Sequence, residues 1–142
     1  MVETSPVRDR VQMVGYKSHG ESVAWLESAD VLFLPLHSPL DGGPTLVVPG
    51  KAYEYLGSGR PILATCPPGD MRTFVESSRS GVVTAGEDVP AISAALAEFA
   101  RAKAQGRSVV SQDRAAVERF ERRALTGRPA GVLEEVVRQA RM

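Results

Sequence analysis

Residues 50 to 65, GKAYEYLGSGRPILAT, contain a predicted helix, its end and the start of a buried strand. The helix begins at Pro49-Gly50, and Gly57 and Gly59 mark its end, because glycine adopts the left-handed conformation that commonly closes a helix. The apolar run Ile62–Ala64 is too short for a buried helix and suits a strand. This order of elements is typical of a parallel α/β domain.

Four short apolar runs are predicted as strands, and the run VLFLPL is apolar at consecutive positions, as in a parallel strand covered on both faces. Helical segments separate these runs, which favours a parallel sheet with helices on both sides. The predicted strands are Val11–Val14, Val31–Leu36, Ile62–Ala64 and Gly81–Thr84.

Helix-capping patterns mark two more helices. Ser18 and Glu21 fit a capping box for a helix that ends near Asp30. Asp88 is the predicted N-cap of another helix, and Gly127-Arg128-Pro129 is expected to separate two terminal helices. The expected apolar faces are Val89, Ile92, Leu96 and Phe99, then Val117, Phe120 and Ala124, and finally Val132, Leu133, Val136, Val137 and Ala140.

Composition excludes several function classes. The 17 Lys and Arg residues balance 17 Asp and Glu residues, so we expect no nucleic acid partner. Cys66 is the single cysteine, and His19 and His37 are not at metal-ligand spacing, so no metal site is predicted. No apolar run approaches the ~18 residues of a membrane span, and no signal peptide pattern is present. We expect a cytoplasmic protein without a membrane span.

The carboxyl ends of parallel strands are where such sheets bind ligands. In the loop from His37 to Gly50, the segment Gly42-Gly43-Pro44-Thr45 could expose backbone N–H groups to an anion, and the helix start near Gly50 would add its positive dipole end. Lys51 lies in the first helical turn, where the helix dipole disfavours a cation. Either Lys51 faces an anionic partner or it is a solvated side chain on a surface loop.

Two further positions remain open from the pattern alone. Glu54 is either an exposed carboxylate paired with Arg60 or an acceptor for two neighbouring hydroxyls, as carboxylates are for ribose. Gly15 would let a flat base approach the backbone with Tyr16 as a wall, or Tyr16 packs on the rim of the sheet.

Three ordered blocks resemble the donor-binding, C-terminal half of GT-B glycosyltransferases of family 4, the group 1 transferases. The similarity covers residues 8 to 140, and its blocks are VQMVGYKSHGESVAWLESADVLFLPL, VPGKAYEYLGSGRPILATCPPGD and SGVVTAGEDVPAISAAL. The resemblance implies one Rossmann-like, three-layer α/β/α domain over residues 1–142. Its mostly parallel sheet would have about four strands, with a flexible N-terminus at residues 1–7 and helices at 107–142.

The resemblance also implies roles for matching residues. Glu54 matches the Glu that hydrogen-bonds the ribose of a sugar nucleotide, and Gly15-Tyr16-Lys17 matches the segment that brackets the base. Gly43-Pro44-Thr45 and the helix start at Lys51 match the part that faces the donor sugar and diphosphate. The substrate implied is a nucleotide-diphospho-sugar, with no separate cofactor.

The chain departs from that family in two respects. Many members carry two Glu separated by seven residues, and the first falls here on Leu46. The acceptor domain and two strands that precede residue 8 in complete enzymes are not in this sequence. We therefore expect a truncated half that is inactive alone. The strand Val11–Val14 would then be separated by a gap from the strand that begins at Val31. Either it moves over to pair directly with that strand, or a homodimer or a separate N-terminal-half polypeptide covers the unpaired edge.

The expected function is donor binding for glycosyl transfer to an unknown acceptor. Two alternatives remain open, a non-catalytic interaction or regulatory remnant of the fold and a nucleotide-sugar 2-epimerase-like domain. The epimerase needs catalytic carboxylates and a His across a cleft, and its second wall is not in the sequence.

Overall fold

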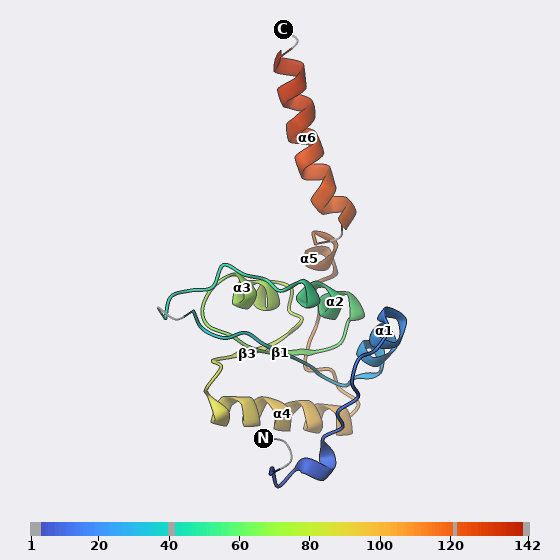
Figure 1. Cartoon of the computed structure of the whole chain (residues 1–142), viewed down its shortest axis with the longest axis vertical. Coiled ribbons are helices and arrows are strands. Elements are labelled where there is room, and N and C mark those ends of the chain that lie inside the picture. Colours follow the sequence, from blue (N-terminus) through green and yellow to red (C-terminus); the bar gives the residue numbers. More distant parts are fainter. Residues whose placement is uncertain (1–3, 40–41, 121, 141–142) are drawn as a thin grey trace.

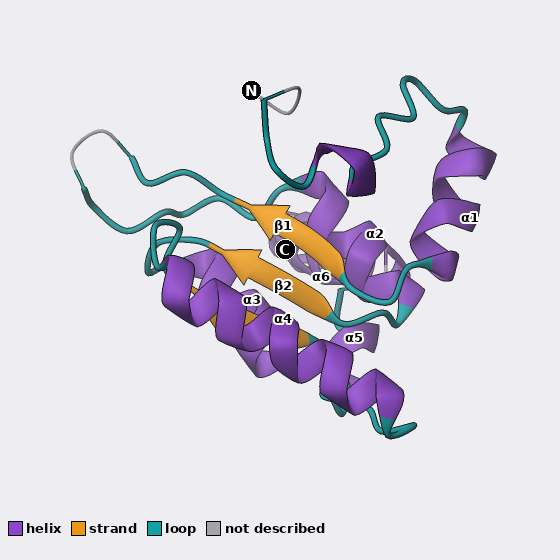
Figure 2. Cartoon of the chain, turned by 90° about the horizontal axis from the view of Figure 1, so that it is seen from below, coloured by secondary structure: helices purple, strands orange, loops and turns teal. Residues whose placement is uncertain are grey.

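A computed structural model describes residues 4–39, 42–120 and 122–140 of the chain. Within this part, three parallel strands form a sheet in the order β1-β2-β3, and the arrows of β1 and β2 run the same way in Figure 2. The strands are β1 (Leu32–Pro35), β2 (Ile62–Thr65) and β3 (Gly81–Thr84). The predicted parallel α/β fold is confirmed.

Helices cover both faces of this sheet and make three layers. In Figure 1, α2 (Gly50–Ser58) and α3 (Asp70–Ser77) lie on one side of the strands and α4 (Val89–Ala104) lies on the other. The sequence predicted α2 and α4 but no helix at the position of α3, which begins at Asp70 with Gly69 as its N-cap.

The central strand β2 connects the two halves of the core. Ile62 and Ala64 pack into the cluster formed with α2 and α3, and Leu63 packs against Ala95 and Phe99 of α4. Each buried Leu or Ile side chain contributes about 1.5–3 kcal/mol. Every residue of β2 is buried, which explains why its sequence is apolar without alternation.

Both predicted helix caps are present. At α1 (His19–Ser28), the Glu21 backbone N–H donates to Ser18 Oγ, and the Ser18 backbone N–H donates to Glu21 Oε2 at 2.9 Å. The bonds from Ser18 hold the pKa of the Glu21 carboxyl below its ordinary value. At a pH above the ordinary pKa of a glutamate, the charged Glu21 stabilises the start of α1. This stabilisation is lost as the pH falls through the lowered pKa, because the carboxyl becomes protonated. At α4, the Ala91 backbone N–H donates to Asp88 Oδ1 at 3.0 Å.

The predicted apolar face of α4 is partly wrong. Phe99 is buried as expected, but Val89 and Leu96 are exposed, while Ala95 and Ala102 are buried. Small alanine side chains let the helix approach the sheet closely. The face that packs on the sheet therefore includes Ala95 and Ala102, and it differs from the face expected from the larger residues Val89 and Leu96.

The predicted strand at Val11–Val14 is also wrong. These residues have no regular secondary structure and follow the 3-10 helix η1 (Arg8–Arg10). Val11, Met13 and Val14 are exposed, Met13 at 81 %. A strand needs a hydrogen-bonded neighbour, and in the described part of the chain none lies beside this segment. The sheet therefore has three strands in that part, and the homodimer stays a prediction.

The C-terminal residues form α5 (Arg114–Glu118) and α6 (Arg122–Ala140), which extends away from the sheet in Figure 1. The predicted break at Gly127–Pro129 is wrong, because α6 continues through Pro129. A proline interrupts one backbone hydrogen bond, and on an exposed helix water satisfies the freed carbonyl. The side chain of Ala124 lies outside the described part.

Aromatic packing attaches this C-terminal region to the core. The Phe120 ring lies 4.7 Å from the ring of Phe74 in α3 and 5.9 Å from that of Tyr53 in α2, measured between ring centroids. Gln112 Nε2 also donates to the Leu56 carbonyl at 2.8 Å. These contacts hold the residues that precede α6 against α2 and α3.

The long loop after β1 is anchored to the turn before α3. Thr45 and Gly69 form a parallel bridge, in which the Thr45 N–H donates to the Pro68 carbonyl and the Asp70 N–H donates to the Thr45 carbonyl, both at 2.9 Å. Gly69 has a φ of +134°, and a Cβ there would lie 2.0 Å from the Thr45 carbonyl oxygen. Only glycine fits this contact.

We predict that Gly69→Ala lowers the free energy of unfolding by about 2 kcal/mol or more, because it strains φ and forces the two loops apart. Gly57→Ala is the matched control. A Cβ at Gly57 meets no atom within 4 Å, so this change in a helix should raise stability by about 0.5–1 kcal/mol. Urea denaturation of both variants measures the effects, and equal stability of Gly69→Ala and the wild type would contradict the prediction.

Candidate functional site

A cavity of about 540 Å³ lies between α1, α2 and the segment that precedes α1. Its size is in the range typical of small-molecule sites, about 300–1,000 Å³. Five of the residues predicted for the site line it, namely Gly15, Tyr16, Lys17, Lys51 and Glu54. The remaining lining residues are Val14, Ser22, Trp25, Leu26 and Tyr55.

The two helices contribute to the cavity in the same way. Ser22, Trp25 and Leu26 of α1, and Lys51, Glu54 and Tyr55 of α2, each follow the i, i+3, i+4 spacing that places side chains on one helix face. Each helix leads into the strand that follows it along the chain, α1 into β1 and α2 into β2.

The charged groups at the cavity are free of ion pairs. Neither Lys17, Lys51 nor Glu54 forms an ion pair with another residue of the described ranges. The pair between Glu54 and Arg60, considered from the sequence, is therefore not formed. Lys51 and Glu54 are exposed and Lys17 is half-buried, so all three can reach a ligand in the cavity.

Aromatic side chains form much of the remaining surface. Tyr16 is 97 % exposed, so it does not pack on the rim of the sheet. Trp25 is 49 % exposed and was not among the residues predicted for the site. A sequence signal existed, because Trp25 is the single tryptophan of the chain and lies one helical turn from Ser22.

Tyr55 reports on the electrostatics of the cavity. Burial raises the pKa of its phenol, and the nearby carboxylate of Glu54 raises it further, since both disfavour the phenolate. The charge of Glu54 therefore acts on another side chain that lines the cavity, the Tyr55 phenol.

The other three predicted residues lie apart from this cavity. Gly43 is half-buried, Pro44 is exposed and Thr45 is buried in the bridge to Gly69. The Thr45 N–H and carbonyl are both used in that bridge. Leu46, at the position of the Glu found in many relatives of the GT-B type, is 79 % exposed.

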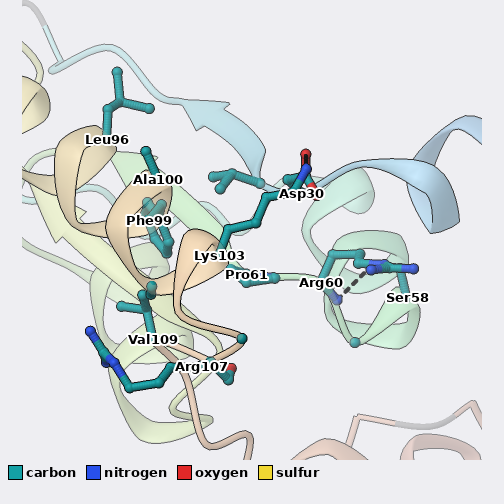
Figure 3. A pocket seen from close by; sticks show the side chains of 15 residues that line it. Asp30, Ser58, Arg60, Pro61, Leu96, Phe99, Ala100, Lys103, Arg107 and Val109 are labelled. Carbon is teal, nitrogen blue, oxygen red and sulfur yellow. Dashed lines mark hydrogen bonds and ion pairs between the residues drawn. The ribbon is translucent and has the colours of Figure 1, made fainter.

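A larger cavity, about 700 Å³, lies at the amino edge of the sheet (Figure 3). Two of its three cations have structural partners, since Lys103 forms an ion pair with Asp30 and Arg107 pairs with Glu98 at 3.1 Å. Helices α1, α2 and α4 end beside it, and cations are favourable at helix carboxyl ends. We therefore place the candidate site in the smaller cavity, where the predicted residues converge.

Other chemistry has less support in the described ranges. There, no group of His, Cys, Asp and Glu side chains is arranged to hold a metal ion. No helix there has the length and apolar character needed to cross a membrane. Cys66 is buried, and this burial raises the pKa of its thiol, which does not suit a nucleophile.

Comparison with known proteins identifies relatives over the first two-thirds of the chain. The family described as "Glycosyl transferases group 1" matches residues 2–102. The "Putative colanic acid biosynthesis glycosyltransferase WcaL" of Salmonella typhimurium is 33 % identical over 101 residues, which are 71 % of this chain and 24 % of the relative. The protein of the same name from Escherichia coli is 31 % identical over the same shares.

The chain thus spans about a quarter of the length of these curated relatives. No solved structure matches it significantly.

We predict that Glu54→Gln lowers the pKa of the Tyr55 phenol part of the way toward its ordinary value. The substitution removes the carboxylate charge and leaves the larger cause, burial, in place. NMR titration of ring-labelled tyrosine measures the change. Glu87→Gln, an exposed acid that does not line the cavity, serves as the control. An unchanged pKa in Glu54→Gln would contradict the close approach of the two groups.

Proposed function

The chain belongs to the glycosyl transferases of group 1, and from that premise we propose that it binds a nucleotide-diphospho-sugar in the cavity between α1 and α2. The observation that carries this proposal is the convergence of five residues from two separate stretches, the segment before α1 and the helix α2. Gly15-Tyr16-Lys17, Lys51 and Glu54 line one cavity.

Glu54 is the proposed acceptor for the ribose hydroxyls. Its carboxylate is exposed at the cavity and has no cationic partner in the described ranges. A carboxylate offers two oxygens to two neighbouring O–H donors, which suits a vicinal diol. An exposed helix carboxylate is ordinarily solvated. The position of Glu54 in the same cavity as Lys17 and Lys51 favours the ligand role.

Lys17 and Lys51 are the proposed partners of the diphosphate. They approach the cavity from the segment before α1 and from the first turn of α2. A lysine in a first turn opposes the helix dipole, and an anionic ligand relieves that conflict. Positive charge near a departing diphosphate also stabilises the transition state of glycosyl transfer.

The reaction that we propose for the whole protein is transfer of the sugar to a carbohydrate acceptor. The WcaL relatives are named for colanic acid biosynthesis, which supports an acceptor of that chemical class. Glu54 is the one carboxylate among the described residues that line the cavity. A donor-binding role is therefore better supported than a complete catalytic centre, and we propose that acceptor binding needs a further polypeptide or domain.

We predict that Glu54→Ala weakens binding of UDP- or GDP-sugars by about 1–3 kcal/mol, the scale of losing hydrogen bonds to a charged group. Isothermal titration calorimetry measures the change. Glu87→Ala removes an exposed carboxylate outside the cavity and should leave affinity unchanged. Equal affinity of Glu54→Ala and the wild type would remove Glu54 from the site, and absence of heat with every nucleotide sugar would favour a non-catalytic remnant.

A second prediction tests the two lysines. The double variant Lys17→Gln, Lys51→Gln should bind UDP about tenfold more weakly, while affinity for uridine, which has no phosphate, should hardly change. Arg60→Gln removes a cation from the larger cavity at the amino edge and is the control. If the double variant loses affinity for uridine and UDP equally, the lysines do not act through the diphosphate.

A further inference from the structure

We propose that Trp25 is the stacking surface for the nucleobase of the ligand that occupies this cavity. The inference rests on the proposed function, because it assigns one part of that same ligand. It adds a residue of α1 to a site whose predicted residues come from the preceding segment and from α2.

The environment of the indole ring is the first argument. Trp25 lines the cavity and is 49 % exposed. Unlike Tyr53, whose ring packs against Phe74 and Phe120, the Trp25 ring contacts no aromatic ring of the described ranges. A large apolar ring that is half exposed within a concave surface still has apolar area to bury, and a flat ligand group buries it.

The second argument is the distance between the two walls of the cavity. Helices in contact have axes about 8–10 Å apart, and α1 and α2 are in contact. Trp25 lies on one helix and Glu54 on the other. In a nucleoside the base is bonded directly to the ribose, so a base on Trp25 and ribose hydroxyls at Glu54 fit this short span.

Stacking on Trp25 contributes affinity without selecting a base. Every nucleobase has a flat π face, so an aromatic platform tolerates all of them. We therefore expect similar losses for UDP, GDP and ADP when the indole is removed. Base choice then depends on groups that meet the edge of the base, and the backbone at Gly15 and Lys17 lines the cavity beside the indole.

The single tryptophan makes the test direct, because all tryptophan emission of the chain comes from Trp25. UDP and GDP should quench this emission along a curve that gives the same Kd as calorimetry. Ribose 5-phosphate, which has the sugar and phosphate but no base, should leave the emission unchanged at concentrations that calorimetric competition shows to be saturating.

Substitutions separate stacking from folding. Trp25→Ala should raise the Kd for UDP about tenfold and leave the Kd for ribose 5-phosphate unchanged. Trp25→Phe keeps a flat ring and should remain within about threefold of the wild type. Phe33→Ala removes an aromatic side chain that is 52 % exposed and does not line the cavity, so it should not affect binding.

The outcomes distinguish this inference from the proposed function. If UDP binds but neither quenches the emission nor binds Trp25→Ala and Trp25→Phe more weakly, the stacking role is overturned and the proposed function stands. If Trp25→Ala weakens UDP and ribose 5-phosphate equally, Trp25 acts on the shape of the cavity and the inference is again overturned. If no nucleotide binds the wild type, the proposed function fails and the inference fails with it.

Discussion

Burial of β2 on both faces is the constraint on which the rest of the structure depends. Ile62, Leu63, Ala64 and Thr65 pair with a strand on each side and are covered by helices above and below. Because all three strands are parallel, each connection must return across the sheet, and helices that lead into a strand begin at its carboxyl edge. Helix α2, which carries Lys51 and Glu54 of the candidate site, is one of these connections.

The two walls of the candidate site differ in how they are held. Helix α2 buries Ala52 and Leu56 in the core, whereas α1 has no buried residue. The capping box stabilises α1 as a helix, and its position depends on its contacts with α2. A ligand that contacts both helices would stabilise α1 in place, since ligand binding favours the state that offers the complete site.

The two cavities show why volume alone does not identify a ligand site. The cavity at the amino edge is larger, but it is bordered by helix carboxyl ends, and two of its three cations, Lys103 and Arg107, form ion pairs. The smaller cavity contains a carboxylate, two amines and three aromatic rings without an ion pair in the described part of the chain. Side chains that the fold leaves unpaired remain available to a ligand, and this distinguishes the smaller cavity.

The sequence by itself determined the local elements whose signals are short-range. The capping residues Ser18 and Asp88, Gly59 at the end of α2 and the apolar runs of β1, β2 and β3 act within a few residues, whereas Gly57, also expected to end α2, lies inside it. The resemblance to group 1 transferases identified Gly15-Tyr16-Lys17, Lys51 and Glu54 from the sequence alone. These signals do not give the distances between elements. The hydrophobic and hydrogen-bonding preferences of one segment do not specify which other segment it contacts.

Only the tertiary structure decided the features that depend on a partner. Val11–Val14 reads as a strand, but without a neighbour to complete its hydrogen bonds it has no regular structure. The face of α4 that packs is set by how closely Ala95 approaches the sheet, and the continuation of α6 through Pro129 is set by the exposure of that helix. The sequence around Trp25 predicts only that it lies in a helix. Trp25 lines the candidate site because α1 packs beside α2.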